Sequence, residues 1–396
     1  MIEEIQNLVE VDNYYTHLEC HESGRVYDKD ILNTYSLENH QPLVAKYNLT
    51  NDWSKDTLKG RPLNMWRYKE VLPVLKEENR ISLGEGFTPV IPLKKLEGTY
   101  EQEQLILKDE SGNPTGSFKA RGISMAVSKA KELGVKAMCI PTAGNAGSAL
   151  SAYCAKAGME AHIFMPESTP KVFQLDCEIM GAKVTKVKGD ISDAAALMQK
   201  KNDGSWFDVT TLKEPFRLEG KKTMGYEIAE QLNWKLPDVI IYPTGGGTGL
   251  IGIWKAFQEM KAMGWITDIP TRMVVVQGDG CDPVIQAFKD GKDHTIKYEN
   301  PARTIANGLR VPKAFGDKLI MKTLYESNGT AISISDLEMR EGLSEFAQQE
   351  GLFLSHEGAA VWMGYKKLKA QNWIKDEESV MLINTGSAYK YAENLY

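Results

Sequence analysis

The chain has few cysteines, no excess of positive charge and no long apolar run. Its 396 residues include five irregularly spaced cysteines, two of them (Cys139 and Cys154) in apolar segments, so no disulfide framework is predicted. The net charge of −6 and the lack of a Lys/Arg stripe argue against nucleic acid as a partner. No apolar run approaches the ~20 residues that a membrane helix needs. Met1–Ile5 is acidic and has no apolar core, so no signal peptide is expected, and a cytoplasmic location is predicted.

From residue 104 onward the sequence alternates strand and helix patterns. Strands are predicted at 104–110, 136–142, 160–166, 183–188, 238–244 and 272–278, and helices at 118–133, 145–157, 171–180, 190–201, 218–232 and 250–263. Several helices end at a glycine and the connections are short, which is typical of parallel α/β sheets. Two such series predict two α/β domains with a cleft between them. Residues 1–65, rich in Tyr, Asn, Asp and Glu, predict an irregular extension packed on these domains.

One lysine, Lys119, lies just past a turn and at the predicted start of a helix, directly after an apolar strand. A lysine that forms a Schiff base with a carbonyl must be deprotonated, and burial together with the positive end of a helix lowers its pKa. Lys119 is therefore a candidate nucleophile on a rigid support. Taken alone, the same segment is more often an ordinary turn and helix cap.

Three further segments follow predicted strands, where ligands bind in open α/β sheets. In residues 141–147, small residues and a helix N-terminus suit a carboxylate, and Asn145 adds a side-chain hydrogen bond. A run of small residues after the strand at 238–244 suits a phosphate held by backbone amides; it comprises Gly245, Gly246, Gly247, Thr248 and Gly249. This run is neither a P-loop nor a dinucleotide fingerprint. Near the C-terminus, Thr385 offers a neutral hydroxyl.

Together the four segments require a ligand with one carbonyl, one phosphate and a ring. Pyridoxal 5'-phosphate has these groups. Lys119 would bind the aldehyde, residues 245–249 the phosphate, Asn145 the ring hydroxyl and Thr385 the ring nitrogen. The expected partner is a small amino-acid substrate.

The chain resembles the fold-type II (tryptophan synthase β-like) pyridoxal-phosphate enzymes, and threonine synthases most of all, over nearly its whole length. The motifs that carry the resemblance lie at 65–73, 83–89, 113–122, 217–223 and 305–310. It implies two open twisted α/β domains with the active site in the cleft between them, and a homodimer. The implied parts are an N-terminal extension (1–65), a large cofactor-binding domain (66–124 and 209–396) and a small mobile substrate domain (125–208).

Relatives often carry a zinc knuckle in the N-terminal part. The corresponding positions here retain only one cysteine, Cys20, and a structural zinc site needs four N/S ligands. A degenerate scaffold without metal is therefore expected.

The resemblance also implies roles for individual residues. Lys119 would bind the cofactor beside Phe118 and then remove the α-proton of the substrate. The loop at residues 141–147 would hold the substrate carboxylate through Thr142, Gly144, Asn145 and Ala146. Arg217, with Lys222 nearby, would bind a second phosphate. The implied activity is that of a carbon–oxygen lyase or replacement enzyme, such as conversion of O-phosphohomoserine to threonine and phosphate.

Some positions depart from the family pattern, namely Ala120, Thr211, Leu212 and the glycine run, which is closer to that of serine/threonine dehydratases. Two activities therefore stay open. A threonine synthase-like enzyme is favoured by Arg217, Lys221 and Lys222, since a dehydratase binds no distal anion. A serine/threonine dehydratase, or an ammonia-lyase acting on a β-substituted amino acid, is favoured by the glycine run. A third alternative is a pyridoxal-phosphate-binding protein without catalysis.

Overall fold

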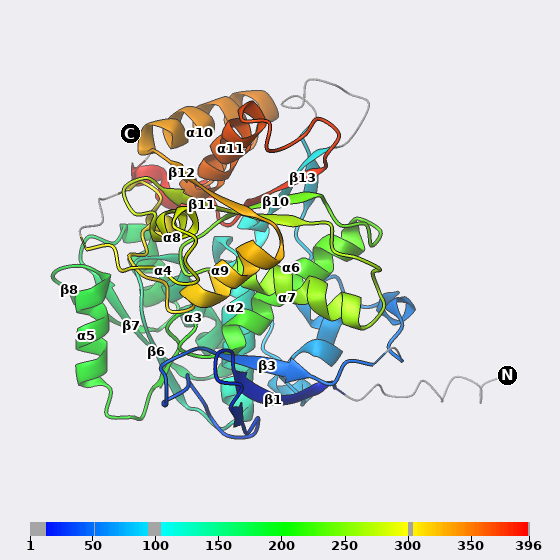
Figure 1. Cartoon of the computed structure of the whole chain (residues 1–396). Helices are drawn as coiled ribbons and strands as arrows, with labels where there is room; N and C mark the ends of the chain where they lie inside the picture. The colour runs from blue at the N-terminus through cyan, green and yellow to red at the C-terminus, as the bar shows by residue number, and fades with distance from the viewer. Residues whose placement is uncertain (1–12, 51, 94–103, 300–303, 395–396) are drawn as a thin grey trace.

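A six-stranded sheet forms the centre of the larger part of the molecule (Figure 1). The computed structural model describes residues 13–50, 52–93, 104–299 and 304–394. The sheet has the strand order β12-β11-β10-β13-β5-β4, and its neighbours are parallel except for the β4–β5 pair. The strands are β4 (Val90–Pro92), β5 (Leu105–Asp109), β10 (Val239–Pro243), β11 (Arg272–Gly278), β12 (Thr330–Ile334) and β13 (Val380–Asn384).

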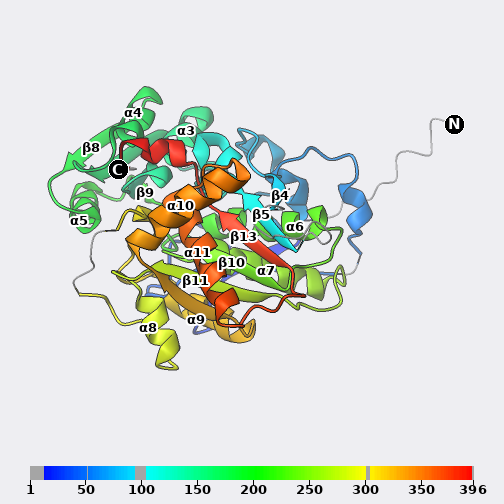
Figure 2. The same ribbon diagram turned by 90° about the horizontal axis from the view of Figure 1, so that it is seen from above.

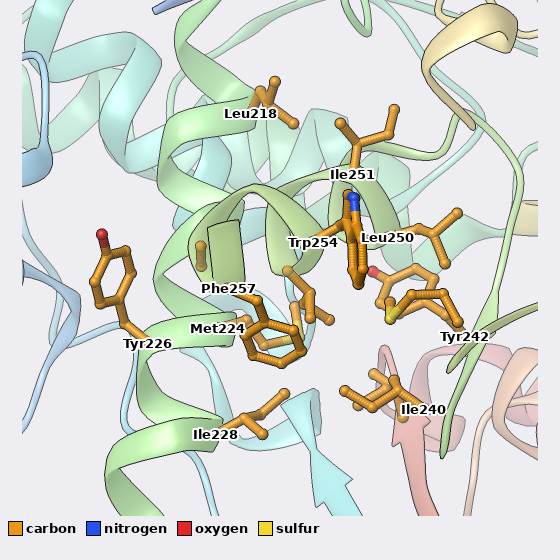
Figure 3. Packing of buried hydrophobic residues seen from close by; sticks show 14 of the residues in the cluster. Leu218, Met224, Tyr226, Ile228, Ile240, Tyr242, Leu250, Ile251, Trp254 and Phe257 are labelled. Carbon is orange, nitrogen blue, oxygen red and sulfur yellow. The ribbon is translucent and has the colours of Figure 1, made fainter. Parts of the chain in front are cut away.

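Each strand of this sheet alternates its side chains between two apolar cores. In β10, Ile240 and Tyr242 pack with helices on one face, whereas Val239 and Ile241 pack with helices on the other. The first face is covered by α6 (Phe216–Gln231), α7 (Thr248–Ala262), α8 (Pro283–Lys289) and α9 (Asp317–Glu326), and the second by α10 (Asp336–Glu350) and α11 (His356–Ala370). Figure 3 shows the first core between β10, α6 and α7. Both faces are buried, as a mostly parallel sheet requires.

A second, smaller sheet is formed by the middle of the chain (Figure 2). Its strands are all parallel, in the order β8-β7-β6-β9. They are β6 (Ala137–Pro141), β7 (Glu160–Pro166), β8 (Lys183–Val187) and β9 (Phe207–Asp208). On one face lie α2 (Lys119–Glu132), α3 (Asn145–Ala157) and α4 (Lys171–Ile179), and on the other lies α5 (Ile191–Lys201).

The N-terminal extension is more regular than the sequence analysis predicted. Three strands, β1 (Tyr15–Cys20), β2 (Val26–Tyr27) and β3 (Leu43–Tyr47), form an antiparallel sheet in the order β2-β1-β3. Leu18, Leu43 and Ala45 are buried, and the intervening residues are partly exposed. This alternation has a period of two, which a search for helix-length apolar patterns passes over. Residues 1–12 of the predicted extension lie outside the described residues.

At the former knuckle positions, the Cys20 thiol lies 3.5 Å from the Asn39 side chain. In the described part of the chain, no cluster of three or more His, Cys, Asp or Glu side chains could hold a metal ion. Nor do the described residues include a helix that combines the length and apolar character needed to cross a membrane.

The two-sheet α/β fold is confirmed, and the predicted elements agree with the structure to within two residues at each end. The helix at 145–157 and the strands at 160–166 and 272–278 begin and end where the sequence placed them. The division into domains at residues 65, 124 and 208 stays a prediction.

Candidate active site

Lys119 is the first residue of α2 and lies beside the turn that follows β13. The Phe118 N–H donates to the Thr385 carbonyl at 3.0 Å, and Ser117 pairs with Gly386 in an isolated antiparallel bridge. These contacts join two segments that lie far apart in the sequence. They bring Thr385, which is buried, next to the lysine.

The environment of Lys119 favours the neutral amine. Burial, together with the nearby Arg217 guanidinium, lowers the pKa of Lys119 to about 7, while the Glu357 carboxylate opposes this shift. The Nζ atom lies 4.3 Å from the centroid of the Phe118 ring. About half of an amine with this pKa is unprotonated at neutral pH, so Lys119 can act as a nucleophile there.

The loop before α3 brings Asn145 to the same place. A Cβ at Gly386 would lie 3.6 Å from Asn145 Nδ2, so the amide is adjacent to the turn after β13. Asn145 Nδ2 donates to the Tyr391 hydroxyl at 3.0 Å. Its Oδ1 is buried and has no hydrogen-bond partner in the described part of the chain. One end of the amide is therefore free to bind a ligand.

The backbone of this loop is held by its own residues. The Gly144 N–H donates to Thr142 Oγ1 at 3.1 Å, and the Gly147 N–H donates to the Gly144 carbonyl at 2.9 Å. The residue that precedes α3 is Gly144, which has no side chain to cap the helix. The first N–H groups of α3, those of Asn145 and Ala146, therefore remain suited to a carboxylate.

The glycine run between β10 and α7 has no room for side chains. A Cβ at Gly245 would lie 2.1 Å from the Gly308 carbonyl oxygen, and one at Gly249 would lie 1.8 Å from the Tyr242 hydroxyl. Gly247 has a φ of 77°, and no side chain caps α7. The helix therefore begins with uncapped N–H groups, including that of buried Thr248, which form a cradle for an anion.

An aromatic contact links this cradle to Lys119. The Tyr242 ring packs edge-on against the Phe118 ring, with 6.2 Å between the centroids. The Tyr242 hydroxyl lies beside Gly249, and Phe118 directly precedes Lys119 in the sequence. The predicted phosphate-binding and aldehyde-binding segments are thus parts of one packed unit.

Arg217 lies in the first turn of α6 and is buried. Its Nη1 donates to the Val209 carbonyl at 2.6 Å, and its backbone N–H donates to the Glu214 carboxylate. Its Nε has no partner among the residues that the structure describes. Burial raises the pKa of Glu214 to about 7, although Arg217 opposes this shift. The guanidinium therefore retains an unused donor close to Lys119.

Lys222 makes its contacts away from Lys119, and its predicted role in substrate binding stays a prediction. Its Nζ donates to the Val71 carbonyl at 2.7 Å and lies 2.6 Å from Glu219 and 3.0 Å from Glu259. It also lies 3.8 Å from the Tyr47 ring centroid. These contacts use its three N–H donors on the side of α6 that faces the N-terminal sheet.

The preceding residue, Lys221, lies on the site's side of the helix instead. Its Nζ is 3.5 Å from the Phe118 ring centroid and has no hydrogen-bond partner within the described ranges. Burial, followed by the charges of Lys119 and Arg217, lowers the pKa of Lys221. The two lysine amines thus share one aromatic ring.

A buried ion cluster, which the sequence patterns did not predict, supports α2. The Arg121 guanidinium bonds both the Glu110 and the Glu227 carboxylates, at 2.6 and 2.5 Å, and Lys108 pairs with Glu227 at 3.1 Å. All four side chains are fully buried. They join β5, α2 and α6 behind Lys119. Charged residues inside an otherwise apolar strand, such as Lys108, were the available signal.

The sequence pattern of the family described as pyridoxal-phosphate dependent enzyme matches residues 81–386. The chain belongs to this family. The chain is 34% identical to the threonine synthase of Methanocaldococcus jannaschii, over 94% of this chain and 92% of that protein. It is 33% identical to the threonine synthase of Methanosarcina acetivorans, with the same coverage. Its cofactor is therefore pyridoxal phosphate.

Solved structures support the fold assignment. Threonine deaminase isoform 2 of Solanum lycopersicum superposes with a TM-score of 0.65 at 21% identity, over 77% of this chain and 82% of that one. An L-serine ammonia-lyase of Rhizomucor miehei gives 0.64 at 19% identity, over 78% and 98%. At these identities the likeness shows the fold of the pyridoxal-phosphate enzyme, and not its substrate.

Proposed function

We propose that the chain converts O-phosphohomoserine to threonine and inorganic phosphate. The observation that carries this proposal is the buried Arg217 guanidinium, which lies close to Lys119 and whose Nε has no partner among the described residues. A buried cation with a free donor favours a substrate that brings its own anion. The similarity to threonine synthases over most of the chain supports the same substrate class.

The residues fit pyridoxal phosphate. The glycine cradle leaves uncapped N–H groups for the phosphate, and Lys119 supplies an amine with a pKa of about 7 for the aldehyde. Asn145 has a free amide end for the ring hydroxyl, and Phe118 packs beside the lysine. The bound cofactor supplies an electron sink for charge that develops at the substrate's Cα.

The remaining roles belong to side chains and backbone of this chain. Thr142, Gly144, Asn145 and Ala146 would orient the substrate carboxylate at the start of α3. The Lys119 amine would take the proton from the substrate's Cα. Thr385 would offer the ring nitrogen a neutral hydroxyl in place of a charged partner. Arg217 would hold the leaving phosphate. Lys222 has no part in this proposal.

A serine/threonine dehydratase is the second candidate. The glycine run is the specific feature that favours it, since five consecutive small residues, from Gly245 to Gly249, replace the family's usual cofactor loop. The similar folds of a threonine deaminase and an L-serine ammonia-lyase are consistent with either activity.

The deciding experiment compares products. Protein loaded with pyridoxal phosphate should absorb visible light, and Lys119→Ala should abolish this absorbance. O-phosphohomoserine should then yield phosphate and threonine, while serine and threonine should yield little ammonia. Ammonia and a 2-oxo acid formed without any phosphate release would overturn the proposal and leave the dehydratase.

A variant pair tests the anion site. Arg217→Gln should raise the KM for O-phosphohomoserine by about tenfold or more, because charged hydrogen bonds contribute about 1.5–3 kcal/mol. Its visible absorbance should persist. Lys188→Gln, which alters an exposed cation of the small-sheet region, is the control and should leave KM unchanged.

We also propose a cytoplasmic homodimer, as the family resemblance implies. Light scattering on the eluting protein should give twice the 44.2 kDa chain mass. A monomeric mass would contradict the dimer without affecting the proposed reaction.

A further inference from the structure

The turn η7 (Ala388–Asn394) carries a tyrosine from the end of the large sheet to the helices of the small one. It follows β13 and the Thr385 turn, and Figure 2 shows it beside α3 and α4. Lys390 pairs with Asp176 of α4 at 2.6 Å, and Asp176 also accepts from Ser148 of α3 at 2.9 Å. The two sheets are therefore bridged directly over the candidate site.

Within this turn, the Tyr391 ring is held from both sides. It packs edge-on against Phe173 of α4 at 5.3 Å and against His356 of α11 at 6.1 Å. Phe173 in turn lies against Gly144, since a Cβ there would meet its ring at 3.3 Å. Tyr391 is 5% exposed, so its hydroxyl has a fixed position and is sheltered from solvent.

That hydroxyl bonds the Asn145 amide, whose other end has no partner in the described residues. A phenol both donates and accepts, so it can bond either end of the amide. In the structure the phenol accepts from Nδ2, which leaves Oδ1 to accept from a ring hydroxyl of the ligand. Burial raises the pKa of Tyr391 well above its ordinary value, so the hydroxyl keeps its proton.

We infer that Tyr391 is a positioning residue that orients the Asn145 amide toward the cofactor's ring oxygen. The inference rests on the proposed cofactor role of Asn145. Asn145 Nδ2 donates to the Tyr391 hydroxyl, and this bond turns Asn145 Oδ1 toward the ligand. The end of β13 thereby contributes twice to the site, through Thr385 and through Tyr391.

The test is Tyr391→Phe, which keeps the ring packing and removes only the hydroxyl. Tyr389→Phe is the matched control, because Tyr389 lies in the same turn and is 76% exposed. Tyr391→Phe should weaken pyridoxal-phosphate binding about fivefold, as loss of one hydrogen bond predicts, and should shift the visible absorption maximum of the bound cofactor. Tyr389→Phe should change neither quantity.

A double-variant cycle separates positioning from general structural support. If Tyr391 acts through Asn145, the cofactor affinity of the double variant Asn145→Ala/Tyr391→Phe should equal that of Asn145→Ala alone. Additive losses would overturn the inference. So would a Tyr391→Phe protein whose affinity and spectrum match those of the wild type while the wild type binds the cofactor normally; that result would leave the proposed function intact. A wild type that does not bind pyridoxal phosphate would overturn both.

Discussion

The lowered pKa of Lys119 should set the pH range of cofactor capture, given the proposed role of this lysine. The neutral amine is the reactive form, so the rate of capture should rise through pH 7 and level off above it. Stopped-flow absorbance with cofactor-free protein and pyridoxal phosphate measures this rate. Between pH 7 and 10.5 the unfolded chain binds more protons at Lys119 than the native chain, so this lysine makes native stability increase with pH there.

Two variants should shift the pH midpoint of cofactor capture in opposite directions. Arg217→Gln removes the cation that lowers the pKa of Lys119, so the midpoint should move up. Glu357→Gln removes the carboxylate that raises it, so the midpoint should move down. A midpoint near 10 in the wild type, or shifts of the same sign in both variants, would contradict the proposed electrostatics.

The glycine cradle gives a second prediction for a single residue. Gly245→Ala should weaken pyridoxal-phosphate binding at least tenfold, because the new Cβ would lie 2.1 Å from the Gly308 carbonyl oxygen and force the loop apart. Equilibrium titration by absorbance measures the affinity. Gly112→Ala is the control, since nothing lies within 4 Å of its Cβ. Equal affinities for the two variants would show that the cradle does not hold the phosphate.

Between elements, the buried ion cluster fixes how α2 packs on β5 and α6. Glu227→Gln removes the carboxylate that pairs with Arg121 and Lys108, which leaves buried cations uncompensated. The free energy of unfolding should fall by about 3–5 kcal/mol. Urea denaturation gives this value. Glu345→Gln, which alters a surface pair with Lys366, should cost less than about 1 kcal/mol. A similar small loss for Glu227→Gln would disprove a structural role for the cluster.

Sequence patterns predicted the elements of the α/β core well because each pattern is local. The helix at 145–157 has its own apolar face, and Gly158 follows it in the left-handed conformation. The directions of Lys221 and Lys222 could not be predicted in this way. Consecutive helical residues point about 100° apart, and α6 is buried on nearly all sides, so no polar face shows which lysine points to the site. Tyr391 was missed because only the tertiary fold brings it to Asn145.

At the scale of the whole molecule, the proposed cofactor site lies between the large and the small sheet. Lys119 and Asn145 begin helices packed on the small sheet, whereas the glycine cradle and Thr385 follow strands of the large one. A ligand that contacts all four should therefore stabilise the entire native state.

Cofactor added at 100 times its Kd should raise the free energy of unfolding by about 2.7 kcal/mol. Calorimetry of cofactor-free and loaded protein measures the change, and Lys119→Ala should reduce it. An unchanged transition on loading would mean that the four segments do not share one ligand.

The central position of β13 has a consequence for translation. This strand lies between β10 and β5, and its Asn384 bonds Asp109, 275 residues earlier in the chain. During synthesis, β5 and β10 are therefore made before the strand that lies between them in the sheet. That strand can pair with them only after residues 380–384 have been made, and Thr385 and Tyr391 follow it. The proposed cofactor site is therefore complete only after residues 380–391 have been made.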